Sequence, residues 1–451
     1  MKCKKILTAL LAAACTMSGC HGDLDIMQDN KLSASNMWID ESDAETATYG
    51  IYLYMRDALK SVHDIYLCWG EFRNGLWGAG TNKTLSGVDQ TQVRTSTMSS
   101  SNAYADWSVM YKTVNQANLI LKHVPEMGIS ESVRNFSLGN AYFSRAWCYF
   151  WIARIWGDAP LALTGYESTG GDLYLPRAPK AEIFARIESD LTEAERYVTD
   201  NSDKAVATPA AVQMLKADYA LWMYRVAGGG SSYLTMAEKA IEALNLSASR
   251  LESDYAQVFS SANKLNKEVI FAFSCLTEDG SSIKISNQFY SYNHPNKGSY
   301  NYRPAGDVMT MYADNDLRKE VSITTLDNLN FVNKYPSGQT GSDPVVISRL
   351  AEMYLISAEA QGLNGGLDRL NELREKRGLD RVSPGNEADF LDAVLQERRL
   401  EFLAEGFRWY DLVRTGKATQ TLGTKDYQCL MPLPSRELLY NPNLKPNNPG
   451  Y

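Results

Sequence analysis

The chain has 451 residues, with 45 basic and 53 acidic side chains and a formal net charge of −8. This length can bury a large core, and seven cysteines without a CxxC pair exclude both a small disulfide-stapled scaffold and a zinc ribbon. The acidic balance argues against nucleic acid as a partner. Aromatic residues are abundant, with 26 tyrosines and 9 tryptophans.

Residues 1–19 have the layout of a lipoprotein signal peptide, with three lysines, an apolar run over 6–14 and small residues before Cys20. The apolar run is too short to span a bilayer. The ending "TMSGC" looks like a bacterial lipobox, which predicts cleavage before Cys20 and lipidation of its thiol. Cleavage leaves 42 basic against 53 acidic side chains, a net charge of −11. We expect a lipidated tether over 20–36 and one folded unit over 37–451.

Hydrophobic periodicity and capping residues predict that the folded unit is mainly helical. The expected helices are 43–59, 104–123, 132–156, 179–197, 208–226, 234–244, 348–362, 366–377 and 387–417. Strand signals are few: one at 268–273 and weaker ones at 282–286 and 321–325. Consecutive helices with short linkers, in which alanine alternates with large side chains, are typical of TPR-like helical hairpins. We therefore predict an α-superhelix of such hairpins with irregular loop insertions and minor β structure.

Two stretches interrupt the helices, residues 69–103 and 286–303, and both mix aromatic with polar residues. Sugar rings stack on Trp and Tyr, and their hydroxyls need Asn, Asp or Arg as partners. The composition is therefore compatible with a glycan-binding surface. The alternative is that the aromatic side chains only pin the two loops to the helical body.

The segment "ERRLEFLAEGFRWYDLVRTGK" over 397–417 is the one place that suggests carboxylate catalysis. Glu397, Glu401 and Glu405 recur every four residues, about 5–6 Å apart on one helical stripe, which suits a retaining glycosidase. Neighbouring arginines lower carboxylate pKa values, whereas a general acid needs a raised one. The neighbours are Arg398, Arg399 and Arg408. We therefore expect an ion-pair lattice that locks a buried helix, and we predict no catalytic residue.

Six stretches, in order, carry a resemblance to a known family. The first is Cys20 followed by Asp23 and Asp25, and the others are "WSVMYKTVNQANLIL" (107–121), "AYFSRAWCYFWIARIWGDAPL" (141–161), "SRLAEMYLISAEA" (348–360), the segment 397–417 and the closing "LMPLPSRELLYNPNLKPNNPGY" (430–451). Together they resemble the SusD/RagB family of outer-membrane nutrient-binding lipoproteins from Bacteroidota. The resemblance covers nearly all of the chain after Cys20.

This resemblance implies a non-enzymatic lipoprotein on the cell surface, anchored in the outer membrane through Cys20. It would capture oligosaccharide and pass it to a SusC-like TonB-dependent outer-membrane transporter. The TPR-like helical part would cover about 37–230, and the C-terminal part, about 231–451, would carry a binding-loop insertion. No cofactor and no metal ligand are implied.

The family's ligand sites fall in loops that match 69–103 and 286–303. By residue type and place, the expected ligand-binding residues are Trp69, Arg73, Asn74, Trp77, Tyr290, Tyr292, Tyr300 and Tyr302. Three alternatives remain open. The protein could capture peptides, as some RagB-type relatives do, it could be a glycoside hydrolase, or it could be a structural TPR-like adaptor.

Overall fold

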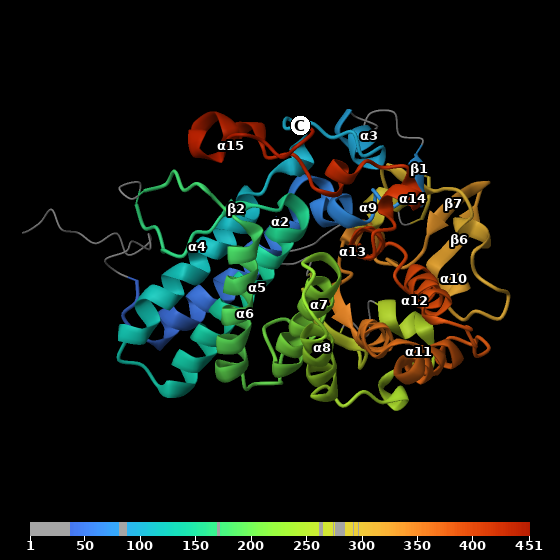
Figure 1. The fold of residues 1–451 in the computed structure, drawn as a ribbon, viewed down its shortest axis with the longest axis horizontal. Coiled ribbons are helices and arrows are strands. Elements are labelled where there is room, and N and C mark those ends of the chain that lie inside the picture. Colours follow the sequence, from blue (N-terminus) through green and yellow to red (C-terminus); the bar gives the residue numbers. More distant parts are fainter. Residues whose placement is uncertain are drawn as a thin grey trace, which may run out of the picture.

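The computed structural model describes residues 37–80, 88–168, 172–260, 265–273, 275, 285–291, 293–295 and 297–451. Helices dominate these residues and strands are short (Figure 1), which confirms the predicted mainly α, TPR-like fold with minor β structure. The helices are α2 (Glu41–Gly70), α3 (Val88–Arg94), α4 (Ser108–His123), α5 (Glu131–Trp156), α6 (Lys180–Tyr197), α7 (Pro209–Val226), α8 (Ser232–Glu242), α9 (Ser286–Phe289), α10 (Lys319–Ser322), α11 (Leu350–Lys376), α12 (Glu387–Glu401), α13 (Arg408–Arg414), α14 (Ala418–Leu422) and α15 (Ser435–Tyr440).

The strands are β1 (Trp77–Ala79), β2 (Ala159–Pro160), β3 (Arg177–Ala178), β4 (Val269–Phe273), β5 (Tyr302–Pro304), β6 (Ile323–Leu326), β7 (Leu329–Val332) and β8 (Val345–Arg349). In the described part of the chain they form antiparallel pairs only: β1 with β5, β2 with β3, β4 with β8 and β6 with β7. The predicted strand 268–273 is β4, and 321–325 overlaps β6. The predicted strand 282–286 lies mostly outside the described residues, and Ser286 begins α9.

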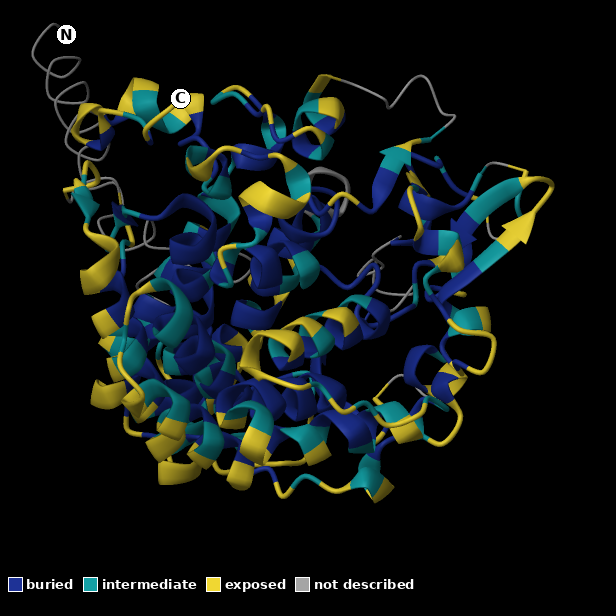
Figure 2. Cartoon of the chain, turned by 45° about the vertical axis from the view of Figure 1, so that its right-hand side comes forward, coloured by how far each residue is buried: buried dark blue, intermediate teal, exposed yellow. Residues whose placement is uncertain are grey.

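Helices that follow one another in sequence pack together, as TPR-like hairpins require. The packed pairs are α2 with α4, α4 with α5, α5 with α6, and α7 with α8, and α8 then contacts α11. Helix α5 lies at the centre and buries residues on all its faces from Leu138 onward, because its sequence is apolar nearly all round. Helix α7 begins as predicted, with the Thr208 side chain accepting a hydrogen bond from the Ala211 amide and Pro209 in the first turn. Figure 2 shows the buried residues filling the centre of the molecule.

The prediction of one helix over 387–417 is wrong. Helix α12 ends at Glu401, and the chain turns through left-handed backbone at Ala404 (φ 66°) and Gly406 (φ 90°) before α13 begins. The helices predicted at 348–362 and 366–377 are both present: they are the two halves of α11, and non-helical backbone at Gly362 (φ 66°) separates them. Glycine adopts positive φ readily but does not require it, so Gly362 and Gly406 are only an indirect sign of these turns in the sequence.

The predicted ion-pair lattice is present, but its arginines come from other elements. Glu401 is fully buried, and its carboxylate contacts Arg318 at 3.0 Å and Arg377 at 2.9 Å and also pairs with Arg349. Burial opposes ionisation of Glu401, yet Arg377, Arg349 and Arg318 outweigh it and hold its pKa well below the usual value. The lattice therefore fastens α12 to α11 and β8, as a structural role requires.

The arginines expected to surround the glutamates have other partners. Arg398 pairs with Asp411 at 2.8 Å, and Arg399 pairs with Asp307. Arg408 begins α13, after the turn that follows Glu401, and it forms no ion pair with a glutamate among the described residues. Spacing along one helix could not identify partners that tertiary folding brings from distant segments.

Candidate functional site

Seven of the eight predicted ligand-binding residues lie in the described part of the chain, and all seven are buried. Their exposed fractions are Trp69 0%, Arg73 3%, Asn74 0%, Trp77 4%, Tyr290 0%, Tyr300 2% and Tyr302 1%. Tyr292 lies outside the described residues. In this structure the side chains pin the loops to the helical body, so their contact with a ligand stays a prediction. The surfaces that these loops shape are then the place to look for a site.

A buried carboxylate, Glu71, fixes the first loop. Its oxygens accept hydrogen bonds from Asn74 Nδ2 at 3.0 Å and Trp77 Nε1 at 3.1 Å, and from the amides of Ala404 at 3.1 Å and Gly406 at 2.9 Å. Burial raises the Glu71 pKa, and these hydrogen bonds partly oppose the rise. The first loop is thus held against the turn that follows α12. This explains why Asn74 and Trp77 are buried.

The structure joins the two predicted loops through the β1–β5 ribbon. Trp77 lies opposite Pro304 and Ala79 lies opposite Tyr302, so residues from 69–103 and 286–303 share one antiparallel pair. The Gly80 amide donates to the Asn301 carbonyl at 3.0 Å. Two segments far apart in sequence therefore form one continuous surface.

A hollow of about 490 Å³ opens beside this ribbon, between the second loop and the β6–β7 hairpin, and we call it the hairpin hollow. Its lining consists of Ser291, Asn293, His294, Gly298, Ser299, Tyr300, Leu326, Asp327, Leu329 and Phe331. Tyr300, Phe331 and Leu329 pack with Tyr290 as an apolar cluster beneath it. The rim carries hydroxyl, amide and carboxylate groups. An apolar base with a polar rim suits a sugar ring.

The ring of His294 stacks on Tyr290 with centroids 4.1 Å apart and an interplanar angle of 23°. Burial lowers the His294 pKa below its ordinary value, and Asp327 partly opposes that shift. The imidazole is therefore neutral at neutral pH. A neutral ring on an aromatic base offers a flat surface with hydrogen-bonding nitrogens rather than a positive charge.

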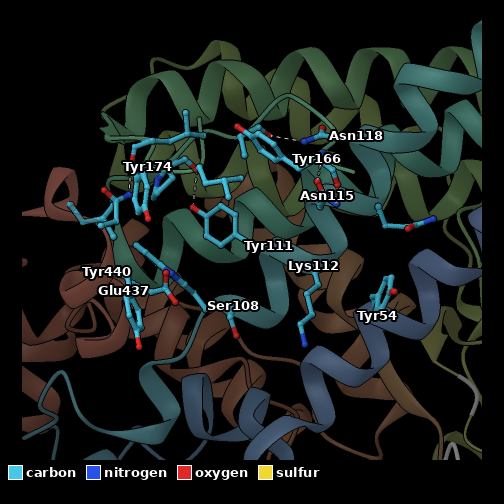
Figure 3. Close-up of a pocket in the computed structure, with 18 of the residues that line it drawn as sticks. Tyr54, Ser108, Tyr111, Lys112, Asn115, Asn118, Tyr166, Tyr174, Glu437 and Tyr440 are labelled. Carbon is cyan, nitrogen blue, oxygen red and sulfur yellow. Dashed lines mark hydrogen bonds between the residues drawn. The ribbon is translucent and has the colours of Figure 1, made fainter. Parts of the chain in front are cut away.

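A larger groove of about 750 Å³ lies along α4, and we call it the tyrosine groove (Figure 3). Its walls come from α4, the chain after β2, and α15, with Tyr54 contributed by α2. Figure 3 shows Tyr174 and Tyr440 at one end, Tyr54 at the other, and Tyr111 with Lys112 between them. The groove was not predicted, because its residues come from four separated segments and each segment alone suggests an ordinary helix or loop.

Several polar groups of the tyrosine groove are already used to hold its walls together. Tyr111 donates to the Pro160 carbonyl at 2.8 Å, and Asn118 donates to the Ala162 carbonyl at 3.0 Å. Asn115 exchanges two hydrogen bonds with the backbone of Tyr166, at 3.1 and 2.8 Å. These contacts fix the chain after β2 on α4, so the groove is preformed.

Other groups in the tyrosine groove face solvent. Tyr54, Tyr174 and Tyr440 are 42%, 55% and 63% exposed. Burial raises the Glu437 pKa, and the nearby Asp106 raises it further. Lys112 on α4 supplies a positive charge to the same groove. The groove thus combines exposed rings with one acidic and one basic group.

Comparison with known proteins gives consistent matches along the chain. Residues 327–429 match the model described as the SusD family, and residues 79–222 match one described as starch-binding associating with outer membrane. The chain is 25% identical to SusD-like protein P38 of Formosa agariphila over 98% of this chain and 97% of that protein. The chain belongs to the SusD family.

Solved SusD-like structures share the fold over nearly their whole length. B. fragilis NanU aligns with a TM-score of 0.80 at 25% identity, covering 94% of this chain and all of that one. Surface glycan-binding protein A from Bacteroides thetaiotaomicron, in complex with laminarihexaose, aligns with a TM-score of 0.77 at 17% identity, covering 90% and 99%. No helix in the described part of this SusD-like chain combines the length and apolarity that a bilayer crossing requires.

Proposed function

We propose that this SusD-like protein binds glycan at the bacterial surface, at the face formed by the β1–β5 ribbon and the hairpin hollow. The observation that carries the proposal is the ribbon itself, which joins both aromatic and polar loops into one surface. The fold of a neighbour whose structure holds laminarihexaose adds support. At 17% identity that neighbour supplies the fold and not the identity of the sugar.

The hairpin hollow has groups suited to a neutral sugar ring. Asn293 and Asp327 are exposed at its rim, and Ser291 and Ser299 add hydroxyls beside them. The left-handed backbone at Asp327 (φ 51°) and Asn328 (φ 60°) makes the tight turn of the β6–β7 hairpin and sets the rim in place. A sugar lying on His294 would meet hydrogen-bond partners on two sides. The buried tyrosines support this surface from below.

We further propose that the protein acts without catalysis and passes its ligand to a SusC-like TonB-dependent transporter. The glutamates of α12 support the first point, because a general acid needs a raised pKa and the Glu401 pKa is held low. The lipobox-like sequence supports a tether through Cys20 that keeps the folded unit at the outer membrane. A surface lipoprotein can then meet polymers before they enter the cell.

The test is binding of residues 21–451 to plant, host and microbial polysaccharides in affinity gels. We expect retardation by one polymer class. Asn293→Ala and Asp327→Asn should each weaken it about three- to tenfold, as expected for loss of one ligand hydrogen bond. Asn135→Ala, at a separate hollow beside α5, is the matched control and should bind normally. Retardation that is unchanged in both hairpin variants would remove the site from this face.

A second candidate function is peptide capture, which the tyrosine groove favours. Its apolar rings would accept side chains, and Lys112 and Glu437 would pair with charges of a peptide of mixed sign. A peptide mixture run beside the glycans decides between the two. The second proposal would replace the first if the protein retained peptides, Tyr440→Ala abolished that retention, and no glycan bound.

A further inference from the structure

A further hollow, of about 390 Å³, lies at the opposite end of the β1–β5 ribbon from the hairpin hollow, and we call it the arginine hollow. Four arginines and one carboxylate line it: Arg73, Arg94, Arg399, Arg408 and Asp307. They come from the first predicted loop, α3, α12, α13 and the chain after β5. Such a concentration of positive charge is unexpected on a chain of net charge −8.

The lining does not neutralise this charge. Asp307 pairs with Arg399, and Arg94 and Arg408 have no ion pair with any residue that the structure describes. Burial and the adjacent Arg399 together lower the Arg408 pKa to about 10. These arginines therefore repel one another in the absence of an added anion.

The acidic groups behind Arg408 are committed elsewhere. Glu71 accepts hydrogen bonds from four donors of the first loop and of the turn after α12. Asp411 is held by Arg398 at 2.8 Å and by Arg414 at 2.9 Å. Both carboxylates still favour the charged form of Arg408 from a distance, but neither forms an ion pair with it.

Unused hydrogen-bonding groups point to the same conclusion. The Nε atoms of Arg73, Arg399 and Arg408 are buried and have no hydrogen-bond partner among the described residues, and neither has the Thr424 hydroxyl. Arg73 is only 3% exposed and is fixed in place, because its guanidinium donates to the Gln428 carbonyl and lies 4.0 Å from the centre of the Trp409 ring. Buried donors without acceptors are rare and destabilising, so an acceptor-rich ligand would stabilise this arrangement.

We propose that the arginine hollow binds an anionic group, a carboxylate or a sulfate ester, carried by the glycan. Guanidinium groups recognise oxyanions through paired N–H donors, and four of them around one hollow fit a tetrahedral or planar anion. This inference rests on the proposed glycan binding and narrows its ligand to an acidic polysaccharide.

The ribbon places the two hollows within reach of one polymer. The Leu76 end of the ribbon borders the arginine hollow and the Tyr300 end borders the hairpin hollow. Gly80 follows Leu76 by four steps of extended chain, roughly 13 Å at the usual rise of a strand. A few linked sugars span such a distance, so one acidic chain can place a ring at one end and its charged group at the other.

The first experiment compares polymers that share a backbone. Isothermal titration uses a sulfated polysaccharide against its desulfated form, and a uronic-acid polysaccharide against its carboxyl-reduced form. We expect one acidic form to bind at least about tenfold tighter than its neutral counterpart, and added salt to reduce the difference. A difference in affinity within the sulfated pair would indicate a sulfate ester as the ligand group, and a difference within the uronic-acid pair would indicate a carboxylate.

Arg94→Gln is the decisive variant, because Arg94 is partly exposed and has no ion pair to lose. It should weaken the acidic polymer about tenfold and leave the neutral polymer unchanged. Arg196→Gln, which removes a 69% exposed arginine of α6, is the matched control and should change neither. Equal affinity for both members of each pair, with Arg94→Gln without effect, would overturn the anionic site and leave glycan binding standing.

A second measurement separates failure of this inference from failure of glycan binding. Sulfate stabilises folded proteins in general, so the informative quantity is the difference between wild type and variant. Sodium sulfate, relative to sodium chloride of equal ionic strength, should raise the thermal midpoint more in the wild type than in Arg94→Gln. This outcome would support the anion site even if no polysaccharide bound. An equal rise in the two proteins, together with equal binding of charged and neutral polymers, would reject it.

Discussion

Gly80 lies directly against the Tyr300 carbonyl, so closely that a Cβ at Gly80 would stand 1.6 Å from the carbonyl oxygen. Tyr300 itself has left-handed backbone (φ 46°), which is uncommon for an aromatic residue. Its hydroxyl donates to the Asn330 carbonyl at 2.8 Å and holds the strained residue in place. The close approach fastens the first loop to the second at the edge of the proposed glycan face.

Gly80→Ala is therefore expected to separate the two loops. Backbone must move to accept the methyl group, at a cost of about 1–3 kcal/mol, and the hairpin hollow should lose its shape. Urea unfolding should show lower stability, and affinity gels should show weaker glycan retardation. Gly78→Ala is the control in the same strand, because its Cβ would meet the flexible end of Arg303 at 3.2 Å. Equal behaviour of the two variants would contradict this account of the junction.

The sequence predicts the fold well where the signals are local. The period of the helices, the Thr208 and Pro209 start of α7 and the apolar strand β4 each follow from residues within a few positions. The break after Glu401 escaped prediction because the apolar pattern continues through the turn, while left-handed backbone at Ala404 depends on tertiary contacts.

The site was predicted less completely, because sequence gives residue types and not their accessibility. The loops 69–103 and 286–303 do meet, yet the side chains of Trp69 and Tyr302 are buried in the hydrophobic core beneath them. The exposed groups come from shorter, less aromatic pieces such as Asn293 and Asp327. No local pattern indicates that Arg94 and Arg408 face one hollow, since α3 and α13 lie more than three hundred residues apart.

Glu401→Gln tests whether the charged stripe is structural. Loss of this carboxylate leaves the buried arginines Arg318, Arg349 and Arg377 short of a partner, which should cost about 3–5 kcal/mol. A large drop in the urea midpoint is expected. Glu372→Gln, at an exposed pair with Arg369, should change stability by less than about 1 kcal/mol.

The same variant addresses catalysis. Incubation of the wild-type protein with a bound polysaccharide should release no shorter product. Product that appears with wild type and disappears in a folded Glu401→Gln protein would restore the glycoside hydrolase hypothesis.

Cys20→Ala tests the proposed anchor. The thiol of Cys20 is the expected site of lipidation. Alanine has no thiol, so the variant should no longer incorporate label from radioactive palmitate. Cell fractionation should then find the variant outside the outer-membrane fraction. Retention in that fraction with full labelling would place the anchor elsewhere.

Two buried glutamates of α11, Glu352 and Glu359, should give opposite pH dependence. Burial and the nearby Asp218 together raise the Glu352 pKa to about 8. Burial also opposes ionisation of Glu359, but Arg414 and Arg225 outweigh it and lower its pKa. The folded state thus keeps a proton on Glu352 that the unfolded chain releases above its ordinary pKa of 4.5.

The contribution of Glu352 to stability is complete below about pH 4.5 and is lost as the pH rises toward about 8, whereas that of Glu359 is present at neutral pH and is lost on acidification. Glu352→Gln should therefore gain stability relative to wild type between about pH 5 and 9, by up to a few kcal/mol. Glu359→Gln should lose most at about pH 7 and least in acid. Urea midpoints of the three proteins across this range decide the matter. Parallel curves would show that neither carboxylate has a shifted pKa in the folded protein.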